Sequence, residues 1–490
     1  MRNSIQQFEE KSIPKINKTI DRYIGSPDDV ASFVKGISEE VIGLGLSIMA
    51  EVFESYDEII RDNLKRRDRY EIVRRDKKEL ITSLGMVQFS KTLFRDKETG
   101  ESRYLLDEFL HFDDHERLTE DAEAMILQEA VQTSYRKAGE AASMTDMVSR
   151  QSVKNRIHRL DFSKVGEAIP EEKKSVDYLY IDADEDHVAL QSNGVKGDLI
   201  PGNDGRKSNC IFAKLVYVYE GIEAADKAGR RRRLVNPHYF SGVYEGKDNA
   251  GLWDEVYDYL DSHYDLEKVK KIYLNSDGGA WIKAGRKRLA GISGVLDEFH
   301  VWKYLTECVS HLSDTREDGM RELLNALRDG DKRAFGSAIK RIDDCARTEQ
   351  EHKRVEACRS YVVSNWEEAR ARFVIDDTVC GCSAEGHVSH VLSVRMSSRP
   401  MGWSRKGADK MARLRAYYYN GGDMLELVRS QKKGLPVAAG AENEVISCDE
   451  VMKEARGRQG IIGKYYDSMS CTLSLQSRKK AAIIRHIWEL

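Results

Sequence analysis

Acidic side chains are concentrated where one apolar segment of the chain ends. The run Tyr178–Ile181 favours a β-strand, and the sequence Asp-Ala-Asp-Glu-Asp follows it at residues 182–186. Side chains two apart on a strand share a face, so Asp182 and Asp184 point the same way. Burying like charges is costly, and a divalent cation with oxygen ligands would balance them. The alternative is a surface hairpin, in which two strands flank a solvated acidic corner.

Two further acids stand at positions typical of ligand sites. Asp277 follows the apolar segment Val269–Asn275 and precedes two glycines. An acid at the carboxyl end of a strand in an α/β sheet lies where ligands bind, although an ordinary Asp-Gly turn has the same pattern. Glu385 lies in the first turn of a predicted helix that Ser383 caps. The candidate catalytic residues and metal ligands are therefore Asp184, Asp277 and Glu385.

Other polar side chains close in sequence to these acids are candidates for supporting roles. A short predicted strand passes into a helix near Asp297, and His300 follows in its first turn. His300 is either a structural histidine or a residue that contacts phosphate or orients a ligand. The candidate supporting residues are Asp182, Asp297, His300, Lys303, His390, Arg395 and Arg399. Asp182 is also the alternative to Asp184 as the first catalytic acid.

Basic and amide side chains gather in a predicted helix that ends near residue 160. Helices are expected over Leu118–Val131 and Ser134–Ala142, and a third begins after Ser149. Two helices, a short turn and a further helix rich in Arg, Lys, Gln and Asn fit a DNA-binding helix-turn-helix. A helical bundle with a charged outer face is the alternative. The candidate DNA-binding residues are Arg150, Gln151, Lys154, Asn155 and Arg159, together with Arg231 and Arg232 from a run of four arginines.

Composition limits the class of protein. The chain has 490 residues and a net charge of −4, so any affinity for nucleic acid must come from local basic patches. No stretch is apolar over the ~18 residues that a membrane span needs, which predicts a cytoplasmic protein. The eight cysteines include no CxxC pair and are expected to be reduced thiols. The spacing of Cys380, Cys382, His387 and His390 is not that of a structural zinc site.

The order of the predicted elements indicates a mixed α/β fold. A helix of some 35 residues is expected after the capping residue Ser26, and the basic run Leu64–Lys78 either contacts phosphate or forms a solvated helix face. Met86–Phe94 and Tyr104–Leu106 predict a small hairpin. The expected regions are 1–110 with the long helix and hairpin, 111–165 with the helix-turn-helix, 175–300 with the first part of an α/β core, 301–375 with inserted helices, 376–430 with the helix of Glu385, and a tail over 431–490.

Four motifs occur in the order YIDADEDHVALQ, LNSDGGAWI, LDEFHVWKYL and CSAEGHVSHVLSVRMSSRPMGWS. Together they resemble the bacterial DDE transposases of the Lre-two insertion-sequence group, formerly an uncharacterised protein family. These enzymes are similar to the Mutator-type transposases, which also carry helices inserted between the second Asp and the Glu. The resemblance covers nearly the whole chain and matches Asp184, Asp277 and Glu385 to the catalytic triad.

The resemblance implies a ribonuclease H-like core whose triad holds two Mg²⁺ ions ~3.5–4 Å apart, with Mn²⁺ as a substitute. It implies cleavage and strand transfer of double-stranded DNA at terminal inverted repeats and at target DNA, by a homodimer or larger assembly associated with the bacterial nucleoid. Two alternatives stay open on the sequence alone. One is a ribonuclease H-like nuclease that acts on DNA structures, and the other is a domesticated DNA-binding regulator.

Overall fold

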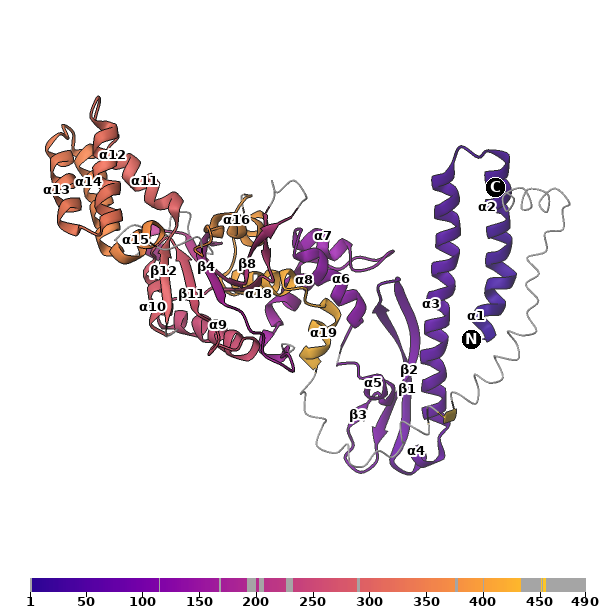
Figure 1. The fold of residues 1–490 in the computed structure, drawn as a ribbon. Coiled ribbons are helices and arrows are strands. Elements are labelled where there is room, and N and C mark those ends of the chain that lie inside the picture. Colours follow the sequence, from indigo (N-terminus) through magenta and orange to yellow (C-terminus); the bar gives the residue numbers. More distant parts are fainter. Residues whose placement is uncertain are drawn as a thin grey trace. The chain divides into compact units, whose positions relative to one another are not determined.

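A computed structural model of the chain describes residues 2–113, 115–166, 169–191, 200–201, 207–225, 232–288, 291–374, 378–399, 401–432, 451 and 453–454. The chain divides into two compact units (Figure 1). The first unit comprises residues 1–130, 134–153 and 428–490, and the second comprises residues 131–133 and 154–427. The predicted tail over 431–490 falls almost entirely outside the described residues. The predicted mixed α/β fold class is confirmed.

The first unit begins with helices, of which the sequence predicts the long one. They are α1 (Arg2–Gln7), the π-helix η1 (Phe8–Ser12), α2 (Ile13–Gly25), α3 (Val30–Asp62) and α4 (Leu64–Arg69). The long helix is therefore confirmed, but its predicted cap is wrong. Asp29 rather than Ser26 caps α3, because its carboxylate accepts a hydrogen bond from the backbone N–H of Ser32 at 3.0 Å.

A three-stranded antiparallel sheet follows these helices. It consists of β1 (Tyr70–Ile81), β2 (Met86–Asp96) and β3 (Ser102–Arg103), in that order. Most of the basic run Leu64–Lys78 is therefore strand, so its interpretation as a helix face is wrong. The predicted strand Tyr104–Leu106 is also wrong, since α5 (Leu105–Phe109) begins there. Pairing between β1 and β2 makes the basic run a strand. The periodicity of a single segment does not reveal such pairing.

The three helices predicted before residue 160 are present as α6 (Glu120–Ala130), α7 (Tyr135–Glu140) and α8 (Arg150–Arg159). Gly139 allows the chain to pass closely beside α7, because a Cβ there would stand 2.1 Å from the carbonyl oxygen of Val148. The connection between α7 and α8 spans residues 141–149 and is longer than the 3–4-residue turn of a typical helix-turn-helix.

The second unit is built on a five-stranded sheet with the order β10-β7-β4-β11-β12. Its strands are β4 (Tyr178–Ala189), β7 (Cys210–Tyr219), β10 (His238–Gly242), β11 (Lys271–Ser276) and β12 (Ile292–Leu296). β10, β7 and β4 are antiparallel neighbours, whereas β11 and β12 run parallel to β4. The acidic segment lies inside the continuous strand β4, so the predicted corner at residues 182–186 is wrong. Two short hairpins accompany the sheet, β5 (Ile200–Pro201) with β6 (Lys207–Ser208) and β8 (Gly221–Ala224) with β9 (Arg232–Val235).

The two faces of this sheet differ in chemistry. One face is aliphatic, with Ile181 of β4 and Leu274 of β11 packed in one core with α9 (Asn249–His263) and Ile282 of α10 (Ala280–Arg288). The other face carries tyrosines, and Tyr180 stacks between Tyr219 and Tyr273 with ring centroids 5.3 and 5.6 Å apart. The short helix α16 (Ala384–Val388) packs against β4, and α18 (Arg405–Tyr419) packs against β10.

Five helices lie between β12 and α16 (Figure 1), and they share a hydrophobic core that also includes Leu296 of β12. They are α11 (Glu298–Cys308), α12 (Arg316–Asp329), α13 (Lys332–Asp344), α14 (Glu349–Ser364) and α15 (Trp366–Val374). The inserted helices predicted over 301–375 are thus present. The remaining elements are the short helices η2 (Phe162–Lys164) and η3 (Gly246–Asp248), the π-helix η4 (Ser389–Ser393), α17 (Val394–Met396) and α19 (Met424–Lys432).

The contact between α9 and α10 depends on a glycine and is open to a stability test. A Cβ on Gly285 would lie 2.0 Å from Cε2 of the buried Trp253, whereas a Cβ on Gly251 would meet nothing within 4 Å. We expect Gly285→Ala to destabilise the protein by about 1–3 kcal/mol, because the rigid indole must move. Gly251→Ala should leave stability unchanged or raise it by up to about 1 kcal/mol. Urea unfolding of both variants checks this, and equal stabilities would contradict it.

Candidate active site

The strand register brings three acids to neighbouring positions at one edge of the sheet. Ala183 of β4 pairs with Ser276 of β11, and Ser276 pairs with Leu296 of β12. The residues that directly follow these three are Asp184, Asp277 and Asp297, in the same order. The backbone N–H of Asp297 donates to the carbonyl of Ser276 at 2.8 Å, which holds the ends of β11 and β12 together. The carboxyl ends of parallel strands are where α/β sheets bind ligands.

These acids influence one another electrostatically. The pKa of Asp184 is raised to about 6, chiefly by burial; the negative charge of Asp277 adds to the rise, while the N–H of Glu185 and His300 oppose it. The pKa of Glu185 is also raised, chiefly by burial. Like charges that share one site oppose ionisation of their neighbours. Asp184 and Asp277 therefore form a half-buried pair whose charge a cation would stabilise.

His300 belongs to the same cluster. Its Nδ1 lies 2.9 Å from Oδ2 of Asp297, the residue that also caps α11 through the N–H of Phe299. This hydrogen bond raises the pKa of His300, burial opposes it, and the charges of Asp277 and Asp184 raise it further. His300 is therefore more protonated near neutral pH than an ordinary histidine, and it sets a positive charge beside two carboxylates.

Asp182 does not belong to this cluster but to a buried hydrogen-bond network. Its carboxylate accepts hydrogen bonds from the Tyr217 hydroxyl at 2.7 Å, the Tyr219 hydroxyl at 3.1 Å, Nδ2 of Asn275 at 2.7 Å and the N–H of Ser383 at 3.0 Å. Burial raises the pKa of Asp182, and these donors oppose that effect. The prediction of a positive partner is wrong for this side chain, because neutral donors from distant segments satisfy it.

The Asp182 network also fixes the helix that carries Glu385. Ser383 precedes α16 as predicted, but its hydroxyl does not cap the helix and instead lies 2.9 Å from the Tyr217 hydroxyl. The far end of the helical segment is held as well, since the Ser397 hydroxyl donates to Asp186 of β4 at 2.8 Å. The residues from Ser383 to Ser397 are thus attached to the acidic strand at both ends.

Glu385 is exposed in the first turn of α16. Ala384 and Val388 form the buried stripe of the helix, and His387 lies on one flank of it, where its ring stacks near Tyr217 at 4.6 Å. At 3.6 residues per turn, Glu385 falls on the opposite flank. Within the described part of the chain, no three His, Cys, Asp or Glu side chains are placed to hold a metal ion together. Among the described residues, therefore, neither the predicted triad nor the Cys-His set near residue 385 is placed to hold a metal ion.

The inserted helices support the turn that carries Asp277. The Tyr361 hydroxyl of α14 donates to the carbonyl oxygen of Asp277 at 2.9 Å. Gly278 has a φ of +87°, and a Cβ there would lie 3.0 Å from Oδ1 of Asn365. Asp277 itself accepts a hydrogen bond from the N–H of Gly279 at 2.9 Å. The sequence does not reveal Tyr361 and Asn365 as site residues, since they lie more than eighty residues away in chain order.

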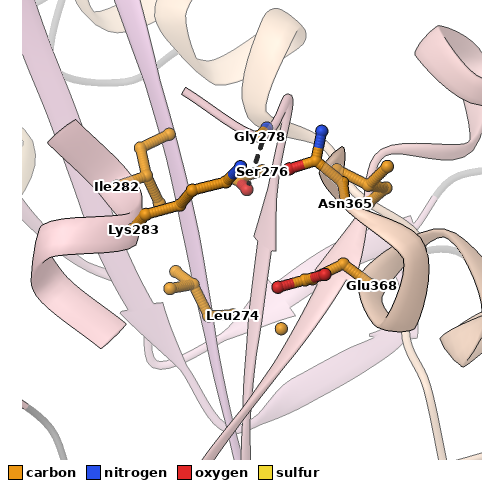
Figure 2. A pocket seen from close by; sticks show the side chains of 9 residues that line it. Leu274, Ser276, Gly278, Ile282, Lys283, Asn365 and Glu368 are labelled. Carbon is orange, nitrogen blue, oxygen red and sulfur yellow. Dashed lines mark hydrogen bonds between the residues drawn. The ribbon is translucent and has the colours of Figure 1, made fainter. Parts of the chain in front are cut away.

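A small pocket adjoins this turn, as Figure 2 shows. It lies on the aliphatic face of the sheet, where Leu274 and Ser276 of β11 point, and Lys283 of α10 and Glu368 of α15 flank it. Asp184 and Asp277 do not line it. The pocket is therefore separate from the acidic cluster.

The remaining candidate supporting residues have varied surroundings. Arg395 is buried, with its guanidinium 4.9 Å from the Trp403 ring centroid. The ring of His390 is 5.0 Å from that of Tyr419. Lys303 and Arg399 are exposed.

The candidate DNA-binding side chains lie mostly at the surface. In α8, Val153 and Ile157 are buried, and the polar side chains lie on the remaining faces. The exposed residues are Arg150, Gln151, Asn155 and Arg159, and Lys154 is half-buried. Arg232 is exposed on β9, and Arg231 lies outside the described residues. None of the described helices is long and apolar enough to cross a membrane.

A sequence profile of the uncharacterised protein family UPF0236 matches residues 29–433, so the chain belongs to this family. Two relatives from Caldanaerobacter subterraneus subsp. tengcongensis, both called UPF0236 proteins, are each 34% identical over 407 residues, which is 83% of this chain and 81% of each relative. The name of the first joins eleven loci of that strain, and the name of the second joins four. A relative from Streptococcus gallolyticus, named for the vanSb 3′ region, is 25% identical over 399 residues, covering 77% of this chain and 82% of the relative.

The raised pKa of Asp184 predicts a pH-dependent stability. Since its pKa is about 6 in the folded protein and ~4 in an unfolded chain, folding favours the neutral form. The stability present below pH ~4 should fall by about 3 kcal/mol as the pH rises to ~6. Asp184→Asn removes this titrating group. Urea unfolding without divalent ions at several pH values should therefore show a pH-dependent difference in unfolding free energy between wild type and variant. A pH-independent difference would contradict the assignment.

The Asp182 network predicts a large structural effect. Asp182→Ala leaves several buried donors without an acceptor and should cost roughly 3–5 kcal/mol of unfolding free energy. Asp258→Ala, at an exposed position in α9, is the matched control and should change stability by less than about 0.5 kcal/mol. Equal unfolding midpoints for both variants would show that Asp182 is not the anchor of α16.

Proposed function

We propose that this UPF0236 protein is a DDE transposase, which binds the terminal inverted repeats of an insertion sequence and catalyses metal-dependent cleavage and strand transfer of DNA. The observation that carries the proposal is the strand register, which sets Asp184, inside β4, beside Asp277, which directly follows β11. The helix of Glu385 begins at the same strand, attached through Asp182. Phosphodiester chemistry on two metal ions needs such a set of carboxylates.

The topology of the second unit supports a ribonuclease H-like core. Three antiparallel strands come first in the chain, and two parallel strands then add on the far side of the first one. This order, with helices after the third and fourth strands, is that of the ribonuclease H-like fold. The inserted helices between β12 and α16 match the insertion of the Mutator-type transposases.

The proposed metal ligands are Asp184, Asp277 and Glu385. Carboxylate oxygens suit Mg²⁺ and Mn²⁺, and burial, together with the charge of Asp277, raises the pKa of Asp184, so a cation would favour its ionised form. Glu385 is exposed on the flank of α16 opposite His387, so its side chain is free of the sheet's aromatic packing. When bound, the two ions would activate the attacking oxygen and stabilise the leaving one.

The protein groups around this site have separate tasks in the proposal. Tyr361 and Asn365 hold the turn of Asp277, which keeps its carboxylate in place. His300, oriented by Asp297, presents a cationic ring to a phosphate oxygen near the carboxylate pair. Asp182 has a structural role in the proposal, because it fixes the start of the helix that carries Glu385.

The names of the relatives support a mobile element. One UPF0236 protein is assigned to eleven loci and another to four loci of a single strain. Repeated copies of one coding sequence in a genome are what transposition leaves behind. The exposed Arg150 and Arg159 of α8 would contact the phosphates of the element's ends, and such binding weakens as salt rises.

Cleavage assays on native DNA test the proposal. The substrate is a linear DNA that contains the gene with its own flanking sequence, incubated with the full chain and Mg²⁺. We expect Asp277→Asn and Glu385→Gln each to reduce end cleavage at least ~100-fold while the gel shift of the end DNA stays unchanged, because these acids act on the scissile phosphate and not on the repeat. Asp258→Asn is the control and should cleave like wild type.

Three results would overturn the proposal. Full cleavage by Asp277→Asn would show that the chemistry lies elsewhere. Cutting of branched DNA without preference for the element's ends would instead support a structure-specific nuclease, and end binding without any metal-dependent cleavage would support a DNA-binding regulator.

A further inference from the structure

An apolar stripe runs along α3 of the first unit on the side that its neighbouring helices leave open. Its members recur with the 4-3-4-3-4 spacing of a heptad repeat and are Val30, Val34, Ile37, Val41, Leu44 and Ile48. At 3.6 residues per turn, all six lie within about 40° of one line along the helix. Val30, Val34 and Val41 are 52, 55 and 52% exposed. Val30, Val34 and Val41 thus face solvent, while Ile37, Leu44 and Ile48 are half-buried.

The other faces of α3 already have partners within the unit. Tyr23 of α2 stacks on Phe33 with centroids 4.5 Å apart, and Lys15 forms an ion pair with Glu40 at 2.8 Å. α1 contacts the same side further along, where Ser4 donates to the carbonyl of Ser47 at 3.0 Å. Figure 1 shows α2 beside α3. These contacts lie on a flank of α3 about 80° away from the stripe.

The three-stranded sheet of the first unit packs on a third side of α3, and it covers only the later part of this helix. A Cβ on Gly45 would lie 2.7 Å from Leu84, in the turn between β1 and β2. The buried residues of α3 are Asp57, Ile59 and Ile60, all near its end. Although every residue of α2 is described, none is buried. A two-helix hairpin without a core is marginal in water, so the first half of α3 lacks the packing that such an apolar helix needs.

We propose that two copies of this chain associate through the apolar stripe of α3, each helix packing on the partner subunit's α3 as a coiled-coil seam. A heptad stripe is complementary to a second copy of itself, since its knobs fit the holes between its own residues. One edge of the stripe carries the small residues Ala31 and Ser38, which permit close approach of two helices. A charged partner would find little to pair with on this surface, whereas a second copy buries it fully.

The proposal rests on α3 alone and is independent of the chemistry assigned to the second unit. Sedimentation equilibrium of the full chain measures the dimer dissociation constant. We expect the double variant Val34→Glu, Val41→Glu to raise this constant at least ~100-fold, because two pairs of buried valines are replaced by like charges. Ser32→Glu, on the opposite side of the first turns of α3, is the control and should leave the constant unchanged.

A second variant decides the question if the double variant does not fold. Val41→Cys places a thiol near the middle of the stripe, close to the partner's Val41 in either orientation of the two helices. A short bismaleimide should crosslink it into dimers in yields well above the wild-type background. The proposal would be overturned by a monomeric wild type, by a dimer that the glutamates do not weaken, or by crosslinking at position 41 that stays at background. Background crosslinking is also the result expected if another segment of the same chain covers the stripe. A dimer that fails to cleave DNA would overturn only the transposase assignment.

Discussion

The carboxylate of Asp182 is the point on which the arrangement of the second unit depends. Its hydrogen-bond donors come from β7, β11 and the residue before α16, so a single buried group joins segments separated by up to two hundred residues. A buried carboxylate without donors would be expelled or neutralised. The hydroxyls of Tyr217 and Tyr219, which the aromatic face of the sheet supplies, allow Asp182 to stay in place. As a result, the Glu385 helix starts beside the strand that carries Asp184.

Asp184 and Asp277 differ from Asp182 in how their negative charge is compensated. Asp182 is saturated with donors, whereas Asp184 is half-buried beside the charge of Asp277, and the N–H of Glu185 and the ring of His300 offset that effect in part. Two residues apart on one strand, one acid is structural and the other is poised for a ligand. This contrast is the physical reason for assigning the proposed chemistry to Asp184, whose ionised form a bound cation would stabilise.

Sequence periodicity was sufficient for most helices, because the apolar stripes of α3, α8 and the inserted helices are local signals. It was insufficient where pairing partners are distant. β4 was predicted as a corner, since four acids favour solvent unless Tyr217, Tyr219 and Asn275 are known to face them. The charged pattern of β1 is also compatible with a helix face, and its strand conformation follows from pairing with β2. Likewise, the alignment of Asp297 with Asp277 follows from register, and the support from Tyr361 follows from the packing of an insertion.

The central claim is that Asp184, Asp277 and Glu385 converge on divalent cations, and metal binding tests it without any DNA substrate. Electron paramagnetic resonance of Mn²⁺ titrated into the full chain reports bound and free ion directly. We predict saturable binding by wild type that weakens at least ~10-fold in Asp184→Asn, Asp277→Asn and Glu385→Gln, because each removes a ligand oxygen charge. Wild-type affinity in Glu385→Gln would mean that this helix does not join the two strand acids, and the account would fail.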